Sequence, residues 1–101
     1  MTVPLRFTKN GRKLANDADS NWLAYHPEKK DLFLDEFQKA LNLLKEYPEV
    51  GTPYIYGGSK NVRRLVLSQS QHFLYYRYSK KRPIVSLLAI FPILLGKNPA
   101  F

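Results

Sequence analysis

The sequence predicts an α+β domain in which a helical hairpin packs on one face of a small, mostly antiparallel twisted sheet. Apolar side chains recur at spacings of three and four residues over much of residues 9–47, which is typical of amphipathic helices. Three runs rich in branched and aromatic residues follow between residues 62 and 91, joined by short polar links that indicate hairpins. The predicted order is β-α-α-β-β-β, and the 101 residues are expected to form a single domain, 1–101.

The first two predicted elements are a short strand and a helix. Apolar residues alternate over residues 3–7, and Pro4 within this run suits an edge strand. Thr8 can cap a helix from about residue 9 to residue 25. The apolar stripe of this helix consists of Leu14, Ala18 and Trp22.

The second helix carries the strongest helical pattern in the chain. His26-Pro27 ends the first helix, because a residue before proline disfavours the α conformation, and Pro27 can open the next helix. Apolar residues then recur at helical spacings to about Tyr47, namely Phe33, Leu34, Phe37, Ala40, Leu41 and Leu44. Such a hairpin needs a sheet to cover its apolar stripes.

The remaining chain supplies that sheet, with strands expected over residues 62–68, 71–78 and 83–91. Their alternation assigns side chains to two faces. The side chains expected to face the helices are Leu65, Leu67, Leu74, Tyr76 and Tyr78. The opposite face is expected to be open, basic and aromatic, with Arg64, Val66, Phe73, Tyr75 and Arg77.

Charge is distributed unevenly along the chain. All eight acidic residues precede residue 50, so residues 50–101 contain no acid and carry the whole formal net charge of +8. A one-sided positive field attracts a polyanion, either nucleic acid or an acidic protein segment. A basic surface can also serve solubility alone.

The composition excludes several classes of site. The absence of cysteine rules out a disulfide framework, a thiolate zinc site and a cysteine nucleophile, and two histidines argue against a histidine metal site, so we expect no metal and no cofactor. The first residues lack the apolar core of a signal peptide, and the longest apolar stretch, residues 84–95, is interrupted and shorter than the roughly 20 residues of a membrane span. The expectation is a soluble cytoplasmic protein with no membrane association.

Three successive segments form a recognisable set of motifs, namely Tyr47-Pro48-Glu49-Val50-Gly51, Asn61-Val62-Arg63-Arg64-Leu65-Val66-Leu67 and His72-Phe73-Leu74-Tyr75-Tyr76-Arg77-Tyr78, preceded by Trp22-Leu23 near the end of the first helix. Together they resemble the RelE/ParE superfamily of toxins from bacterial toxin-antitoxin modules. Each motif is weak alone, but their order and spacing extend the resemblance over nearly the whole chain. It implies a RelE/ParE-like fold and a type II toxin held inactive by a cognate antitoxin from the same operon.

The resemblance implies one of two mechanisms. RelE-like members cleave mRNA on the ribosome, and ParE-like members inhibit DNA gyrase. A metal-independent ribonuclease needs several cations and proton carriers in fixed geometry, and the best available set is Arg64, His72, Tyr75 and Arg77. If the chain is not a ribonuclease, these four side chains pack in the core or lie on a solvated surface.

Departures from the ribonuclease pattern favour the ParE-like branch. Phe73 stands where RelE-like nucleases tend to place a basic residue, and Pro92-Ile93-Leu94-Leu95-Gly96 stands where they carry a catalytic arginine followed by tyrosine. Losing one transition-state contact typically lowers a rate by about 10² to 10³, so we expect no catalysis by this chain. The long helical hairpin is also more ParE-like.

The sequence therefore predicts a ParE-like toxin that arrests growth by binding and inhibiting DNA gyrase. The residues expected to bind this target, or the DNA it holds, are Arg63, Arg64, Arg77, Lys80, Lys81 and Arg82. The apolar residues expected to contact the antitoxin, or to dock on the protein's own core, are Ile93, Leu94 and Leu95. Two alternative functions stay open: a RelE-like endonuclease acting on mRNA at the ribosome, and a non-toxic nucleic-acid-binding module. Leu94-Leu95, in place of the basic residue that many family members keep there, also leaves open a degenerate toxin.

Overall fold

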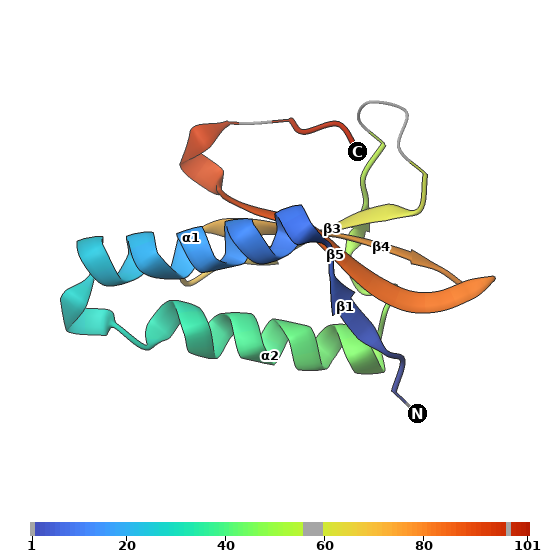
Figure 1. Cartoon of the computed structure of the whole chain (residues 1–101), viewed down its shortest axis with the longest axis horizontal. Coiled ribbons are helices and arrows are strands. Elements are labelled where there is room, and N and C mark those ends of the chain that lie inside the picture. The colour runs from blue at the N-terminus through green and yellow to red at the C-terminus, as the bar shows by residue number, and fades with distance from the viewer. Residues whose placement is uncertain (1, 56–59, 97) are drawn as a thin grey trace.

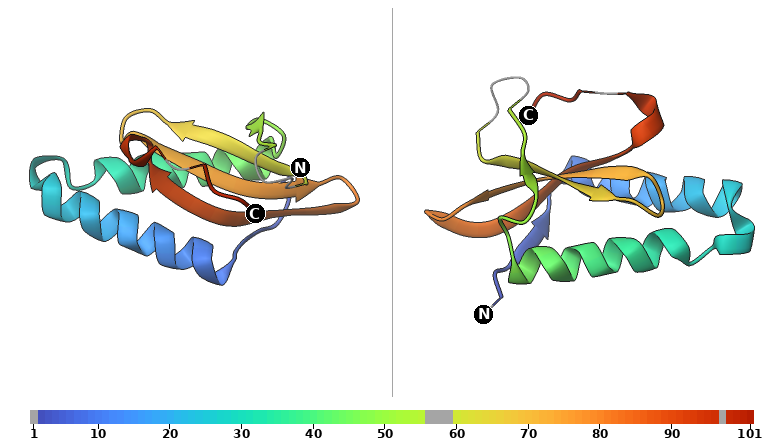
Figure 2. Two further views of the ribbon diagram at one scale, coloured as in Figure 1. Left: turned by 90° about the horizontal axis from the view of Figure 1, so that it is seen from above. Right: turned by 180° about the vertical axis from the view of Figure 1, so that it is seen from behind.

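Two antiparallel helices cover one face of a five-stranded sheet (Figure 1). The computed structural model describes residues 2–55, 60–96 and 98–101. Figure 2 shows the C-terminal segment on the side of the sheet away from the helices. This arrangement confirms the predicted α+β class, with a helical hairpin on one face of a mostly antiparallel sheet.

The elements follow the predicted order, with one short strand added. Their bounds are β1 (Leu5–Phe7), α1 (Lys9–Tyr25), η1 (Pro27–Lys29), α2 (Leu32–Glu46), β2 (Thr52–Pro53), β3 (Val62–Leu67), β4 (His72–Ser79), β5 (Arg82–Pro92) and the 3-10 turn η3 (Ile93–Leu95). In the sheet order β1-β5-β4-β3-β2, β1 runs parallel to β5 and the other neighbours are antiparallel. The sequence does not predict β2, because two residues ending in a proline carry no alternation signal. No helix within residues 2–55, 60–96 and 98–101 is both long enough and apolar enough to span a bilayer.

Helix α1 begins and ends where the sequence predicts. The Thr8 hydroxyl caps it by accepting a hydrogen bond from the Gly11 N–H at 2.9 Å. The same hydroxyl donates to the Leu87 carbonyl at 3.0 Å, so the cap also fastens the helix to β5. At the other end, His26 leaves the helical conformation before Pro27.

Pro27 opens the short turn η1 rather than the second helix. The Trp22 indole Nε1 donates to the Lys29 carbonyl at 2.8 Å, and its ring stacks on His26 with centroids 4.0 Å apart. These contacts hold the link in a compact turn. Helix α2 therefore starts only at Leu32.

The main core lies between the helices and the sheet. The strands place Leu67, Leu74 and Tyr76 in this core, with Leu65 and Tyr78 at its margin, which agrees with the alternation in the sequence. The helices contribute mainly Ala15, Ala18, Trp22, Phe33, Phe37, Ala40, Leu41 and Leu44.

A second, smaller cluster lies on the opposite face of the sheet. It consists of Tyr54, Val62, Tyr75, Leu88 and Ala89, with Phe73, Phe91 and Phe101 packed against it. The expectation that this face is open is therefore wrong at its centre, where Tyr75 is only 1% exposed. The covering residues, 54 and 101, are distant from β4 in sequence, so alternation along a strand cannot reveal them.

Glu36 of α2 ties the helical layer to the turn between β3 and β4. Its carboxylate accepts hydrogen bonds from the Gln69 N–H at 2.7 Å, the Ser70 N–H at 2.9 Å and the Ser70 hydroxyl at 2.7 Å. Hydrogen bonds to an ionised acceptor are stronger than those between neutral groups.

We expect Glu36→Ala to lower the free energy of unfolding by about 2 kcal/mol in urea denaturation. Lys39→Ala, at an exposed position of the same helix, is the control and is expected to change it by less than about 0.5 kcal/mol; equal effects contradict the prediction.

Candidate functional site

Arg64 and Arg77 lie on the face of the sheet opposite the helices. In the pairing of β3 with β4, Arg64 stands opposite Tyr75 and Arg77 opposite Val62. The Arg64 guanidinium carbon lies 4.1 Å from the centre of the Phe73 ring, within the range of a cation–π contact. The Arg77 side chain is exposed and its Nε donates to the main chain at residue 60 over 3.3 Å.

Lys80, Lys81 and Arg82 extend this positive charge to the hairpin between β4 and β5. All three are exposed, and Figure 1 shows the hairpin projecting beyond the helices. The Lys80 ammonium lies 3.7 Å from the Glu49 carboxylate, an exposed pair that contributes little to stability. Arg64, Arg77 and the hairpin cations together define what we call the basic face.

Arg63 and Arg64 are neighbours in sequence but lie on opposite faces of β3, and Arg63 shares the Glu49 carboxylate with Lys80. The Arg63 guanidinium donates to the Glu49 carbonyl at 2.9 Å and the Gly51 carbonyl at 2.7 Å, and lies 3.8 Å from the Glu49 carboxylate. The Gly51 N–H in turn donates to the buried Tyr76 hydroxyl at 2.9 Å. Arg63 therefore fastens the segment after α2 to the sheet through its Nη1 group.

The four residues of the ribonuclease alternative are not brought together. His72 points to the helical side of the sheet, is 6% exposed and lies 5.0 Å from the Phe33 ring. Tyr75 is on the other face and is buried in the second cluster. Arg64 lies beside Tyr75, whereas Arg77 is near the far end of β4. No common point is within reach of an imidazole on one face and guanidinium groups on the other.

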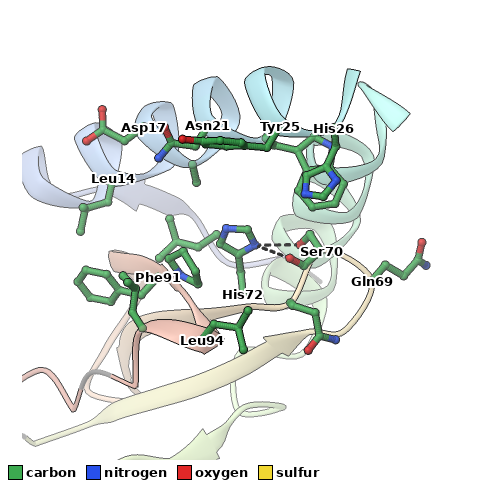
Figure 3. A pocket seen from close by; sticks show the side chains of 16 residues that line it. Leu14, Asp17, Asn21, Tyr25, His26, Gln69, Ser70, His72, Phe91 and Leu94 are labelled. Carbon is green, nitrogen blue, oxygen red and sulfur yellow. Dashed lines mark hydrogen bonds between the residues drawn. The ribbon is translucent and has the colours of Figure 1, made fainter. Parts of the chain in front are cut away.

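A groove of about 660 Å³ opens between α1, the turn before β4 and η3 (Figure 3). Its apolar wall consists of Leu14, Ala18, Trp22, Ile90, Phe91, Pro92, Leu94 and Leu95. Among the described lining residues, Asp17 is the one carboxylate and none is Lys or Arg. Two of the residues predicted to contact an antitoxin stand at the rim of the groove: Leu94 is 96% exposed and Leu95 is 56% exposed. The third, Ile93, is half-buried, and its N–H donates to the Gln71 carbonyl.

His72 lines the floor of this groove. Its Nδ1 lies 3.0 Å from the Ser70 carbonyl, which can only accept, so Nδ1 carries the proton of the neutral ring. Figure 3 shows the imidazole rising from β4 toward α1, held on one side by Ser70. Burial lowers the pKa of His72 below its usual value, and the Ser70 hydrogen bond and the Glu36 charge oppose this effect only in part.

The position of His72 could have been read from the sequence. It is two residues before Leu74, which the alternation assigns to the helical side, so the same rule separates His72 from Tyr75. The roles of Tyr54 and Phe101 as covers of the second cluster carry no such signal. Within residues 2–55, 60–96 and 98–101, no three His, Asp or Glu side chains gather as a metal site requires.

The lowered pKa of His72 predicts a pH-dependent stability. Because the folded state binds this proton less readily than the unfolded chain, its full stability is present above pH 6.5 and is lost as the pH falls below that value. We expect the free energy of unfolding to decrease as the pH falls from about 6.5 to about 5.5, and His72→Gln to remove most of the decrease. Urea denaturation at a series of pH values measures it. An equally steep decrease in both proteins contradicts the assignment.

Comparison with known proteins supports the fold. No family model and no curated protein sequence matches the chain. Among solved structures, a chain of the chromosomal ParDE toxin-antitoxin system from P. aeruginosa matches with a TM-score of 0.69 and 15% identity, over 90% of this chain and 96% of that chain. The E. coli RelBE toxin-antitoxin complex matches with a TM-score of 0.60 and 15% identity, over 89% of this chain and 95% of that chain.

A mutant of the E. coli RelE toxin in the free state also matches. Its TM-score is 0.58 at 16% identity, over 95% of this chain and 88% of that chain. These likenesses confirm the resemblance to RelE/ParE toxins at the level of the fold. The chain has the RelE/ParE fold across nearly its whole length.

Proposed function

We propose that this chain is the toxin of a type II toxin-antitoxin module and that it arrests growth by inhibiting DNA gyrase through binding. One observation carries the proposal: a fold shared with ParDE and RelBE proteins presents a basic face on which the four candidate catalytic residues, Arg64, His72, Tyr75 and Arg77, do not converge. Binding needs complementary charge and shape, whereas catalysis without a metal needs convergent groups.

The basic face supplies the complementary charge. Arg77, Lys81 and Arg82 are exposed, and residues 50–101 contain no carboxylate to neutralise them from within the sheet. Arg64, which lies over the Phe73 ring, adds a guanidinium group of the kind that binds carboxylates or phosphates. An acidic surface of gyrase, or the DNA that gyrase holds, is the proposed ligand.

The positions of the candidate catalytic groups favour binding over RNA cleavage. His72 is separated from Arg64 by the sheet, and Tyr75 is covered by the second cluster. A ribonuclease site built on these residues would need a different arrangement of β4. This separation supports the ParE-like branch.

The proposed partner in the cytoplasm is an antitoxin encoded beside the toxin. The groove, with Leu94 and Leu95 at its rim, suits an apolar segment of this partner. The basic face suits acidic residues of the same partner, which would then exclude the target.

Inducible expression in bacteria tests the proposal. We expect growth arrest that is relieved by co-expression of the small gene next to this one. Primer extension on translated mRNA is expected to show no new 5′ ends during the arrest. Cleavage within translated codons would assign the chain to the endonuclease alternative, and normal growth would assign it to the non-toxic binding modules.

A further inference from the structure

The groove contains a hydrogen-bond acceptor that the rest of the fold leaves unused. The Ser70 carbonyl fixes the proton of the neutral His72 ring on Nδ1, so the other ring nitrogen, Nε2, is an acceptor. Within residues 2–55, 60–96 and 98–101, no group donates a hydrogen bond to Nε2. Every fully enclosed side-chain N or O atom of these residues has a partner, so Nε2 reaches the open space of the groove. Figure 3 shows this nitrogen turned away from Ser70 and toward α1, although the His72 side chain as a whole is only 6% exposed.

The charges around the groove favour an uncharged ligand. Among the described lining residues none is Lys or Arg, so an anion would find no cation here to offset its loss of water. The one carboxylate in that set, Asp17, already pairs with the Lys13 ammonium at 2.8 Å. An acceptor that a ligand covers without a matching donor costs free energy, and an O–H or N–H group on the ligand avoids this cost. The polar requirement of the groove is therefore one neutral donor placed at His72.

The walls of the groove favour an aromatic ring. Trp22, Tyr25 and Phe91 line it together with aliphatic side chains. Aromatic rings that meet edge to face or offset gain stability beyond the burial of their area. The groove volume of about 660 Å³ lies within the range of roughly 300 to 1,000 Å³ that is typical of small-molecule sites. Such sites combine mostly apolar walls with a few precisely placed polar groups, as this groove does with His72.

We propose that the groove is a binding site for a small, uncharged aromatic compound with one O–H or N–H donor, and that His72 Nε2 accepts the hydrogen bond from this donor. The compound would lie between α1 and the end of β5, below the rim that Leu94 and Leu95 form. This binding does not depend on the proposed function. A bound compound would exclude an apolar antitoxin segment from the same groove, and only that consequence rests on the proposed function.

A matched pair of compounds tests the donor. The first, 2-naphthol, has two fused rings and one hydroxyl, and the second, 2-methoxynaphthalene, has the same rings with a methyl group in place of the hydroxyl hydrogen. Isothermal titration calorimetry of the full chain at neutral pH is expected to give 2-naphthol a dissociation constant on the order of 0.1 mM. The ether is expected to bind about tenfold more weakly, because it leaves Nε2 without a donor. Equal affinities overturn the proposal, and so does a failure of 2-naphthol to bind.

The tryptophan signal shows where the compound binds. Trp22 is the one tryptophan of the sequence and lines the groove, so the single indole N–H signal in a proton–nitrogen NMR spectrum reports on this site. This signal is expected to shift with added 2-naphthol and to reach saturation with the dissociation constant that calorimetry gives. A stationary Trp22 signal at saturating 2-naphthol would place the compound elsewhere on the protein and overturn the proposal.

A variant of His72 tests the acceptor. His72→Phe keeps a ring and removes Nε2, so it is expected to weaken 2-naphthol about tenfold and to change the affinity of the ether by less than about twofold. Leu43→Ala, at an exposed position of α2 outside the groove, is the matched control and is expected to bind both compounds as the wild type does. Circular dichroism verifies the fold of each variant. Undiminished 2-naphthol affinity in folded His72→Phe overturns the proposal, and if that variant does not fold, the two compounds on the wild type decide it.

A charged analogue tests the requirement for an uncharged ligand. In 2-naphthoate a carboxylate replaces the hydroxyl, and this compound is expected to bind at least about tenfold more weakly than 2-naphthol. An equally tight 2-naphthoate complex would overturn the proposed ligand class. The expected binding results together with normal growth on expression would reject the proposed toxin function and leave the groove site standing. Growth arrest without binding of 2-naphthol would do the reverse.

Discussion

Alanine in place of Gly11 is expected to lower the free energy of unfolding by about 3 kcal/mol. A Cβ at this position would lie 2.2 Å from the Leu87 carbonyl oxygen and 3.0 Å from the Leu87 carbonyl carbon. Both atoms belong to the main chain of β5, which cannot move aside as a flexible side chain can. The same carbonyl accepts hydrogen bonds from the Thr8 N–H and hydroxyl, so pushing α1 away would also break the helix cap.

The expected loss of stability in Gly11→Ala is opposite to the usual effect of replacing a helical glycine by alanine. Alanine is favoured over glycine inside a helix by about 1 kcal/mol, so propensity alone predicts a more stable protein. Gly96→Ala is the control, because no atom lies within 4 Å and only the left-handed φ of 61° opposes the new side chain, which costs about 1 kcal/mol. Urea denaturation compares the variants. A Gly11→Ala protein as stable as the wild type would contradict the close packing of α1 on β5.

Reversing charge on the basic face is expected to abolish growth arrest. The double variant Arg77→Glu, Lys81→Glu replaces two exposed cations, so its effect on stability is expected to be small. Placing two carboxylates against an acidic target is expected to weaken binding by about 100-fold or more, since like charges brought together cost several kcal/mol. Counts of viable cells after induction measure the loss.

Lys9→Glu, Lys39→Glu is the matched control for this prediction. Both residues are exposed on the helical side of the molecule, and the change in net charge is the same. We expect this variant to arrest growth as the wild type does. Loss of arrest in both variants would trace the effect to net charge, and arrest by both would exclude the basic face from target binding.

Local patterns predict the elements of the fold well. Residues 9–25 form a helix as predicted because the apolar stripe, the Thr8 cap and His26-Pro27 all specify the same segment. Alternation along β4 likewise assigns Leu74 and Tyr76 to the helical side of the sheet, where the structure places them. The close approach of Gly11 to β5, by contrast, is a contact between distant segments that no local pattern contains.

The candidate site depends on contacts between distant segments and is predicted less completely. Neighbouring arginines take different roles, because Arg63 meets main-chain carbonyls of the segment after α2 while Arg64 meets Phe73 across β4. The cover over Tyr75 comes from Tyr54 and Phe101, whose sequence surroundings have no periodicity. Alternation gives the face of a side chain but not what covers that face.

Inhibition of purified gyrase in a DNA supercoiling assay tests the central claim most directly. We predict that the folded wild-type chain inhibits supercoiling at micromolar concentration, that the Arg77→Glu, Lys81→Glu variant does not, and that the Lys9→Glu, Lys39→Glu variant does. Undiminished supercoiling in the presence of micromolar folded wild-type protein would contradict it.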